Sequence, residues 1–577
     1  MSIHGGARTS WKSGLVPVVF WLCFWVTLHA SLLILNICVG QGRWGWESFD
    51  AELIYASFLC LPLLFLSAKN KATGFLLSLG ITRLCLAVLP HFKDSIPKSK
   101  VSLIDHDPII FVATAIGLGV YLLLCISRIH LGNKAAYPVR KFLKDAKKAA
   151  CQGNFILGIE RKGGFLFRKS VVLAESARCL HGQVVGSSGS GKTQLTLALA
   201  FQDMLRGWPV FFMENKGDSR DFGLFYELAK SAGRERDVIK IDFFDPASKK
   251  LNPIKLPGNP DPLATTNQIM LAIGREPGGS SESEFYKHLD NARVLDMAKI
   301  FHASGQDLSL RRAYLFFSNP KFRKKTFFAC EDHFKTINAA KARLGTEAGD
   351  LTAITTHLYP WASGILGKTV NPKHPDLVIE DIFNKKLLAY VLIPIGDLRN
   401  QTNALGKMMI ELLLACAQKR QRNGFSLPAS IILEEFSEFV TKSFSTLVST
   451  ARSAGFCLTL SHQDFGQLRR VEDMDKDAFV SNVNANTAGF KVFFNAVNDE
   501  DAEKMAKMFG TYTEAKKTRR IKVGLTGAKS TGDYSERETE SFHIHPNEFK
   551  RLKAFKAGVK AGDMPPKLVA TPAVYGL

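Results

Sequence analysis

Long apolar runs crowd into the first 130 residues of the chain, whereas the remainder alternates short apolar runs with amphipathic stretches. Residues 14–40 contain one histidine and no aspartate, glutamate, lysine or arginine, and they are long enough to cross the roughly 30 Å hydrocarbon core of a bilayer. Three further apolar runs are shorter, and an arginine interrupts the second of them; they lie at 53–68, 73–90 and 109–127. The pattern predicts an N-terminal helical transmembrane domain over residues 1–130, with about four helices.

The basic residues around these runs indicate how they are oriented. Arg8 and Lys12 precede the run at 14–40, and Lys69 and Lys71 follow the run at 53–68. A basic stretch that starts at Arg128 follows the run at 109–127. Lysine and arginine gather on the cytoplasmic side of membrane proteins, so four spans with both termini inside satisfy these signs. Three spans would place one terminus on the wrong side. We therefore expect a multi-pass membrane protein whose remaining residues face the cytoplasm.

From about residue 150 the apolar runs become short and alternate with helical stretches, which is typical of an α/β fold with a mostly parallel sheet. The run HGQVV at 181–185 leads into GSSGSGKT and then into the amphipathic stretch QLTLALAFQDML. A Gly/Ser turn can be merely flexible, but strand, glycine-rich loop and helix in this order predict a phosphate-binding loop. Lys192 is expected to reach the β- and γ-phosphates of ATP, and Thr193 to bind Mg²⁺. The predicted nucleotide-binding residues are Gly186, Ser187, Ser188, Gly189, Ser190, Gly191, Lys192 and Thr193.

A pair of carboxylates ends a later apolar run, ASIILEEF at 429–436. An acid at the end of a strand beside the phosphate loop can hold Mg²⁺, and a second acid can polarise the attacking water. We assign Glu434 to the metal and Glu435 to water activation. The alternative is a strand that enters an acidic helix N-terminus, where glutamate is also favoured.

Two more polar residues are candidates for catalysis. Gln463 ends the apolar run FCLTLSHQ, where an amide can sense the γ-phosphate, although a single glutamine is more often an ordinary loop residue. Arg452 lies in the polar stretch STARSAG just before that run. An arginine there can reach a neighbouring subunit's site and stabilise transition-state charge, although an ordinary surface arginine is the simpler interpretation.

Charge and cysteine content narrow the choice of partners. The net charge is +22, and part of the excess follows the last apolar run, where membrane topology explains it. A second basic cluster, EAKKTRRIK at 514–522, has few aromatic residues nearby, so a solvated surface is favoured over a nucleic-acid site. The ten cysteines include no C-x-x-C pair, and this pattern fits a reducing compartment with buried free thiols rather than a disulfide framework or a zinc site.

In their order behind predicted spans, these motifs resemble those of the coupling proteins of type IV secretion and conjugation systems, the TraG/TraD/TrwB type. The similarity covers roughly residues 150–260 and 380–560. Several segments besides the phosphate loop and IILEEF carry it: MENKGDS at 213–219, LNPIK at 251–255, ARSAGFCLTLSHQDFGQL at 451–468, NVNANT at 482–487, NDEDAEKMAKMFG at 498–510 and FHIHPNEFKRL at 542–552.

The resemblance implies a RecA-like P-loop NTPase core over 131–261 and 376–577, with an inserted all-α domain at 262–375. It also implies a homo-hexameric ring in the bacterial inner membrane, with Arg452 acting in trans. The partners it implies are inner-membrane components of the secretion channel, and either a relaxase with single-stranded DNA or effector proteins with adaptors.

Some features depart from the family pattern, and other functions stay open. Glu434 and Glu214 stand where the family usually has aspartate, and four spans would exceed the usual two. The alternatives are a coupling protein dedicated to effectors, a DNA translocase of the FtsK/HerA type, and a membrane scaffold whose nucleotide site does not hydrolyse. The intact Lys192, Thr193 and Glu435 argue against the scaffold.

Overall fold

The computed structural model describes residues 136–160, 169–258, 261–276, 283–329, 338, 340, 351–393, 398–469, 475–524 and 527–577. The chain divides into two compact units, Met1–Ser127 and Arg128–Leu577. All four predicted spans lie outside the described residues. Among the helices that are described, none has both the length and the apolar character needed to cross a bilayer.

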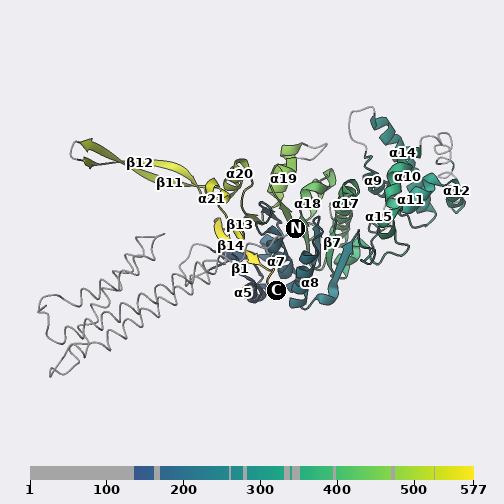
Figure 1. Ribbon diagram of the computed structural model, residues 1–577, viewed down its shortest axis with the longest axis horizontal. Helices are drawn as coiled ribbons and strands as arrows, with labels where there is room; N and C mark the ends of the chain where they lie inside the picture. Colours follow the sequence, from purple (N-terminus) through teal and green to yellow (C-terminus); the bar gives the residue numbers. More distant parts are fainter. Residues whose placement is uncertain are drawn as a thin grey trace, which may run out of the picture. The chain divides into compact units, whose positions relative to one another are not determined.

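Strands of the second unit form one large sheet and two small ones (Figure 1). The strands are β1 (Tyr137–Pro138), β2 (Asn154–Glu160), β3 (Ser170–Ala174), β4 (Gly182–Val185), β5 (Val210–Glu214), β6 (Val238–Asp242), β7 (Leu388–Leu392), β8 (Ala429–Glu434), β9 (Phe456–His462), β10 (Phe490–Phe493), β11 (Thr511–Gly524), β12 (Gly527–Phe542), β13 (Lys556–Ala561), β14 (Lys567–Ala570) and β15 (Pro572–Ala573).

The helices connect these strands. They are α5 (Val139–Ala150), α6 (Glu175–Arg178), α7 (Lys192–Leu205), α8 (Ser219–Ser231), α9 (Pro262–Ile273), α10 (Ser283–Ala303), α11 (Leu310–Ser318), α12 (Pro320–Phe328), α14 (Thr352–Ala362), α15 (Gly364–Thr369), α16 (Ile379–Asn384), α17 (Arg399–Asn423), α18 (Lys442–Thr450), α19 (Lys476–Asn486), α20 (Asp499–Phe509) and α21 (Pro546–Lys550). Short 3-10 turns lie at Glu235–Asp237, Phe436–Phe439 and Gln467–Arg469.

The eleven-stranded sheet has the order β3-β2-β14-β13-β10-β4-β9-β8-β5-β7-β6. All pairs from β10 to β6 are parallel, and the pairs from β3 to β10 are antiparallel. The prediction of an α/β fold with a parallel-rich sheet is confirmed. The antiparallel edge was not predicted; only a short turn joins β13 to β14, and parallel pairing needs a longer crossover.

Alternating residues of the central strands supply the two faces of the sheet, as β5 shows. Val210 and Phe212 pack in a core shared with α5, α7 and α8. Phe211 and Met213 point the other way, into a core shared with α9, α17 and α18. The run VFFM is apolar throughout because helices cover both faces, as expected for a buried parallel strand.

Every element that the structure describes between β6 and β7 is a helix. These helices do not close a separate core, since their buried residues belong to the same cluster as those of α17. Asn252, in the turn after β6, donates a 2.8 Å hydrogen bond to the carbonyl of Leu308. Trp361 donates one of 2.9 Å from its indole N–H to the carbonyl of Ala272. The insertion is therefore attached to the sheet by apolar packing and held together by buried polar contacts.

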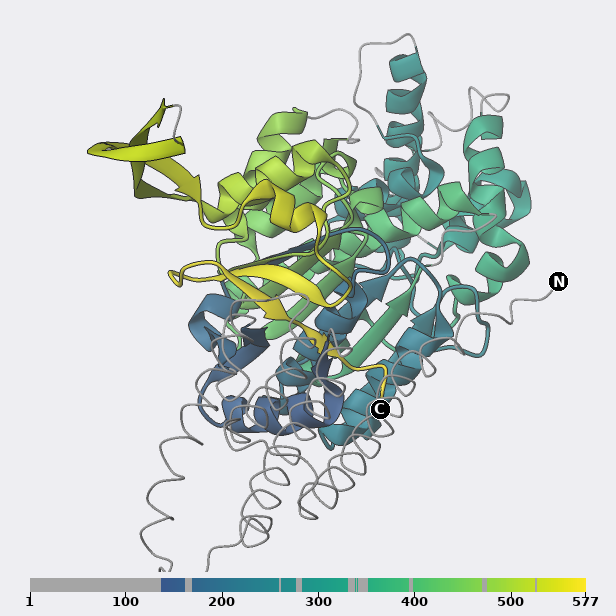
Figure 2. The same ribbon diagram turned by 60° about the vertical axis from the view of Figure 1, so that its left-hand side comes forward.

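Strands β11 and β12 form an antiparallel hairpin that stands away from the rest of the unit (Figures 1 and 2). The basic cluster predicted at 514–522 lies on β11. Residues 511–516 are exposed, in agreement with a solvated surface. The hairpin itself was not predicted, because its strands lack the apolar alternation that identifies a half-buried strand.

Candidate nucleotide-binding site

The predicted phosphate loop connects β4 to α7 at the carboxyl edge of the sheet. Gly189 and Gly191 have φ angles of 73° and 111°, in the region that L side chains rarely adopt. Gly191 is also the N-cap of α7, and a Cβ atom there would lie 3.0 Å from the ring of Phe555. The loop therefore depends on glycine to bring its backbone N–H groups to the N-terminus of α7, where helix geometry favours an anion.

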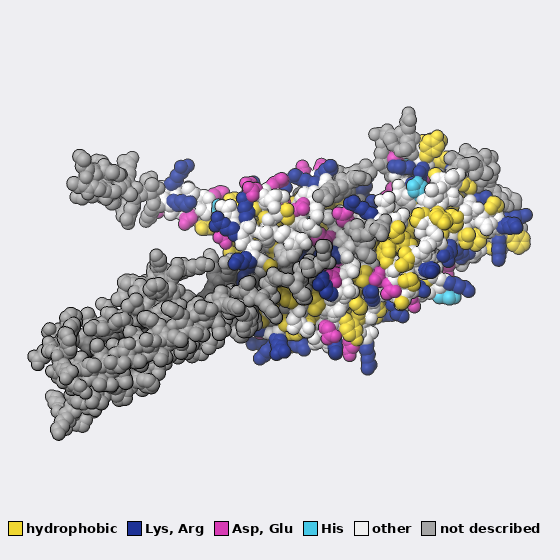
Figure 3. All heavy atoms as spheres, viewed as in Figure 1, with side chains coloured by type: hydrophobic (Ala, Val, Ile, Leu, Met, Phe, Trp, Pro, Cys, Tyr) yellow, Lys and Arg dark blue, Asp and Glu magenta, His cyan; other side chains and the backbone are white. Residues whose placement is uncertain are grey.

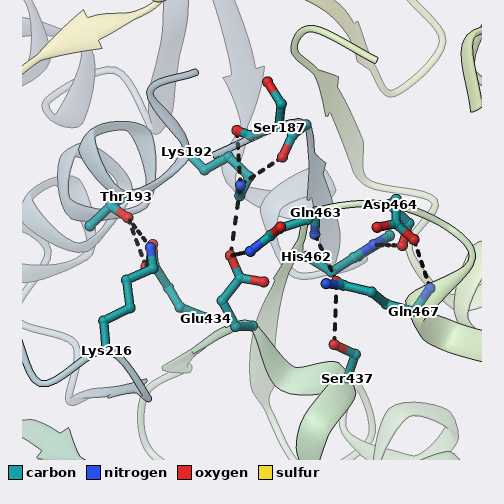
Figure 4. A network of polar contacts seen from close by, with 12 residues as sticks. Ser187, Lys192, Thr193, Lys216, Glu434, Ser437, His462, Gln463, Asp464 and Gln467 are labelled. Atoms are coloured by element: carbon teal, nitrogen blue, oxygen red, sulfur yellow. Dashed lines mark hydrogen bonds and ion pairs between the residues drawn. The ribbon is translucent and has the colours of Figure 1, made fainter. Parts of the chain in front are cut away.

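Lys192, the first residue of α7, is buried within the loop. Its ammonium donates to the carbonyls of Gly186 (2.6 Å) and Ser187 (3.2 Å) and lies 3.7 Å from Oε1 of Glu435 (Figure 4). Burial lowers the pKa of Lys192, and the carboxylate of Glu435 opposes that effect. The loop thus holds a positive charge at its centre, where a bound phosphate would lie.

The hydroxyl of Thr193 donates a 2.8 Å hydrogen bond to Oε2 of Glu434. Thr196, one turn farther along α7, donates one of 2.5 Å to Oε1 of the same carboxylate. Glu434 is the last residue of β8 and is 1% exposed, so α7 and β8 fix its position jointly. The structure therefore brings together the two residues predicted to bind the metal.

Glu435 follows in a left-handed conformation, with φ of 50°, which is uncommon for a residue that is not glycine. This backbone ends β8 and turns the carboxylate towards Lys192. Gln463, just past the end of β9, donates a 3.3 Å hydrogen bond from its Nε2 to Oε1 of Glu435. Burial raises the pKa of Glu435, while Lys192 and Lys216 act in the opposite direction. The predicted base and the predicted sensor are therefore in direct contact.

Residues 214–216, between β5 and α8, complete the site, although their side chains were given no role from the sequence. Lys216 places its ammonium 3.2 Å from Oγ1 of Thr193 and 3.6 Å from Oε2 of Glu434. Burial tends to lower its pKa, but the carboxylates of Glu434 and Glu435 more than compensate, and the pKa is raised. The MENKGDS segment was the only signal that could have revealed this lysine.

Glu214, at the end of β5, is fully buried, and neither of its carboxylate oxygens has a hydrogen-bond partner among the described residues. Burial raises its pKa to about 8, and the negative charges of Glu434 and Asp221 add to the effect. The site therefore contains an acid that is largely protonated near neutral pH.

A second polar network supports the end of β9 (Figure 4). Gln467 accepts hydrogen bonds from the backbone N–H of Gln463 (3.2 Å) and from the hydroxyl of Ser437 (3.4 Å). His462 is fully buried, with its ring 2.9 Å from Nε2 of Gln183, and burial lowers its pKa to about 4. This histidine is neutral and structural.

Arg452 lies apart from these residues, just before β9, whereas Gln463 follows that strand. Since β9 is seven residues long, about 20 Å separates its two ends. The side chain of Arg452 is exposed. It does not join the site of its own chain, and its predicted role in a neighbouring subunit stays a prediction.

The donor set fits a magnesium nucleotide. Mg²⁺ prefers oxygen ligands such as the hydroxyl of Thr193 and the carboxylate of Glu434, and these two already hold a cation, the ammonium of Lys216, between them. Loop, lysine, hydroxyl and strand-end acids together define a P-loop NTPase on a RecA-like α/β core.

Comparison with known proteins narrows this class. Residues 428–554 match the family model described as the TraM recognition site of TraD and TraG. The type 4 coupling protein DotL of Legionella pneumophila is 18% identical over 395 residues, which cover 59% of this chain and 50% of the relative. The chain thus spans about half the length of that curated relative. These matches agree with the resemblance found in the motifs: the chain is similar to the type IV coupling proteins.

A solved structure shows the same fold. The bacterial conjugative coupling protein TrwBdeltaN70, in its unbound monoclinic form, has a TM-score of 0.51 at 16% identity, covering 74% of this chain and 92% of that one. The plasmid coupling protein TrwB in complex with ADP and Mg²⁺ has a TM-score of 0.48 at 16% identity, and the match covers 70% of this chain and 87% of that one.

Proposed function

We propose that this chain is a membrane-anchored ATPase that recruits a substrate and drives it into a type IV secretion or conjugation channel. The observation that carries the proposal is the convergence of Lys192, Thr193, Glu434 and Glu435 at one edge of the sheet. The motifs resemble those of coupling proteins. A motor that drives a substrate through a channel needs a site that hydrolyses ATP.

Each residue of the site would have its own role in ATP hydrolysis. The loop N–H groups and Lys192 bind and orient the phosphates, and Glu435 accepts a proton from the attacking water. Its raised pKa suits that role, because a base works best when its pKa approaches the operating pH. Gln463 orients the carboxylate of Glu435 and links it to β9. Mg²⁺ bound by Thr193 and Glu434 would neutralise charge on the phosphate oxygens.

The setting and the partners are part of the same proposal. The spans predicted over residues 1–130 would anchor the motor in the bacterial inner membrane, beside components of the channel. The motors would form a homo-hexameric ring with Arg452 acting between subunits. The substrate would be a relaxase with its single-stranded DNA, or effector proteins that adaptors deliver. The net charge of +22 favours DNA.

An ATPase assay on the purified full chain in detergent tests hydrolysis. We expect Mg²⁺-dependent turnover in the wild type and a loss of about 100-fold or more in Lys192→Ala. A wild type that binds no nucleotide, or a Lys192→Ala variant as active as the wild type, contradicts the proposal.

The same assay with added single-stranded DNA at low salt tests the substrate, since phosphate contacts are strongest there. We expect turnover to rise. Turnover that DNA leaves unchanged argues against DNA and in favour of effector proteins.

A further inference from the structure

The β11–β12 hairpin extends beyond the body of the unit (Figure 1). Its base is anchored by Phe542, which packs against the main core, and by Tyr512, whose ring centroid lies 5.3 Å from that of His543. Away from the base, residues 513–516 and 536–538 are exposed. A two-stranded ribbon by itself is marginally stable in water, and its two open edges invite pairing. The hairpin is thus a candidate interaction surface.

The strand register places Lys516 and Arg537 on one face of the hairpin, together with Glu514 opposite Thr539. The two basic residues outnumber the acidic one, and we call this the basic face. Lys516 lies directly opposite Arg537, so both side chains project from the same side of the ribbon. Like charges opposite each other are destabilising, and an acidic partner would relieve the repulsion. Neither side chain forms an ion pair with another described side chain.

On the other face the register places three glutamates, together with Lys517 opposite Glu536 and Arg519 opposite Tyr534. Glutamates outnumber basic residues there, and we call it the acidic face. Glu538 lies opposite Ala515 and Glu540 opposite Thr513. Because successive residues of a strand point to opposite sides, Glu536 projects from this face as well. Glu538 and Glu540 are exposed and have no ion-pair partner among the described residues. Figure 3 shows basic and acidic side chains gathered along this part of the hairpin.

We propose that the hairpin is an arm that joins copies of this chain, with the basic face of one hairpin against the acidic face of the next. The two faces are opposite in net charge, so each copy carries both halves of a head-to-tail contact. A nucleic acid is the poorer fit. It would satisfy Lys516 and Arg537 but would be repelled by the acidic face, and the hairpin carries five acidic residues beside its seven basic ones.

This inference rests on the proposed ring assembly and names a surface that would build it. It does not depend on nucleotide hydrolysis. Head-to-tail contacts close into a ring when the rotation between copies permits. The contact between charged faces is expected to weaken as salt is added, since exposed charges are screened.

Charge reversal on each face tests the contact in the full chain in detergent. The acidic-face variant is Glu538→Lys with Glu540→Lys, and the basic-face variant is Lys516→Glu with Arg537→Glu. A control, Lys321→Glu with Lys324→Glu, makes the same charge change as the basic-face variant, on exposed positions of α12. Molar mass is measured by size-exclusion chromatography with light scattering, and thermal unfolding checks that each variant folds.

We expect the wild type and the control to self-associate, and each variant alone to associate at least about tenfold more weakly. An equimolar mixture of the two variants should recover the wild-type mass. In an alternating assembly every contact then again joins a basic face to an acidic one.

Four outcomes overturn the inference. The first is a variant that associates as the wild type does; this leaves ring assembly through other surfaces intact. The second is a mixture that stays dissociated. The third is a basic-face variant that loses single-stranded DNA binding with unchanged association. A wild type that hydrolyses ATP as a monomer rejects both this contact and the proposed ring, but not the ATPase.

Discussion

The ammonium of Lys216 lies 3.2 Å from the hydroxyl oxygen of Thr193. It also lies 3.6 Å from Oε2 of Glu434, so a lysine sits between the two residues predicted to bind Mg²⁺. Two unit charges 4 Å apart interact with about 4 kcal/mol at an effective dielectric constant of about 20, and a divalent ion doubles this. Mg²⁺ held by Thr193 and Glu434 would therefore compete with the lysine ammonium for the same oxygens. Lys216 would then have to move.

Replacing Lys216 should lower the Mg²⁺ requirement of the site. We expect Lys216→Met to reach half-maximal binding of a fluorescent ATP analogue at about tenfold less Mg²⁺, because the competing charge is gone. Lys230→Met is the matched control, since Lys230 lies on the exposed side of α8 and pairs with Glu227. Binding titrations over a Mg²⁺ series measure the effect. An unchanged Mg²⁺ dependence would show that the lysine does not compete.

Removing the charge of Glu435 should stop hydrolysis without stopping binding. We expect Glu435→Gln to lower the turnover number by about 10²–10⁴, the range typical of a lost general base, and to keep nucleotide affinity within a few-fold. Glu438→Gln is the control, because Glu438 lies one turn farther on and pairs with Arg399 at the edge of the site. Steady-state ATPase rates and equilibrium binding separate the two effects. Equal losses in both variants would argue against a base at position 435.

The phosphate loop could be predicted from the sequence because strand, loop and helix are contiguous there. The partners of the loop come from distant segments, and their proximity depends on the strand order. Strand β8 lies two strands from β4, with β9 between them, so Glu434 reaches Thr193 across the edge of the sheet. An apolar run with an acidic end indicates a carboxylate at the end of a strand, but it does not tell which residues lie beside that carboxylate in the fold.

The position of Lys216 in the site and the strands of the β11–β12 hairpin could not be predicted from the sequence, for physical reasons. A lysine in a loop carries no periodic signal, and its position depends on how β5 ends beside β8. The strands of the hairpin have polar and charged residues on both faces, so the hydrophobic pattern that reveals strands is missing. The antiparallel edge strands were missed because local pattern does not specify pairing direction.

The raised pKa of Glu214 should make stability depend on pH. The folded-state pKa is about 8, against an ordinary value of 4.5, so between these values the folded chain binds more protons than the unfolded chain. Stability from this group is therefore full below about pH 4.5 and is lost as pH rises towards 8, by up to about 1.4 kcal/mol per pH unit.

Glu214→Gln removes this titration and keeps the shape of the side chain. We expect the variant to gain stability over the wild type as pH rises from 5 to 9, with a difference that levels off above about pH 8. Thermal unfolding of both proteins over that pH series measures it. Glu227→Gln, on the exposed surface of α8, should show no such trend. A constant difference between Glu214→Gln and the wild type would mean that Glu214 does not titrate in this range.

Arg452 offers a test of cooperation between subunits, because it is exposed and lies at the opposite end of β9 from Gln463. If it completes a neighbour's site, Arg452→Ala alone should lose about 10³-fold or more in ATPase rate, as does removal of an arginine finger. Mixing Arg452→Ala with Lys192→Ala should then restore part of the activity. In mixed assemblies the intact loop of an Arg452→Ala subunit meets the intact arginine of a Lys192→Ala subunit. A surface arginine would leave Arg452→Ala active alone, and an arginine that acts within its own chain would leave the mixture inactive.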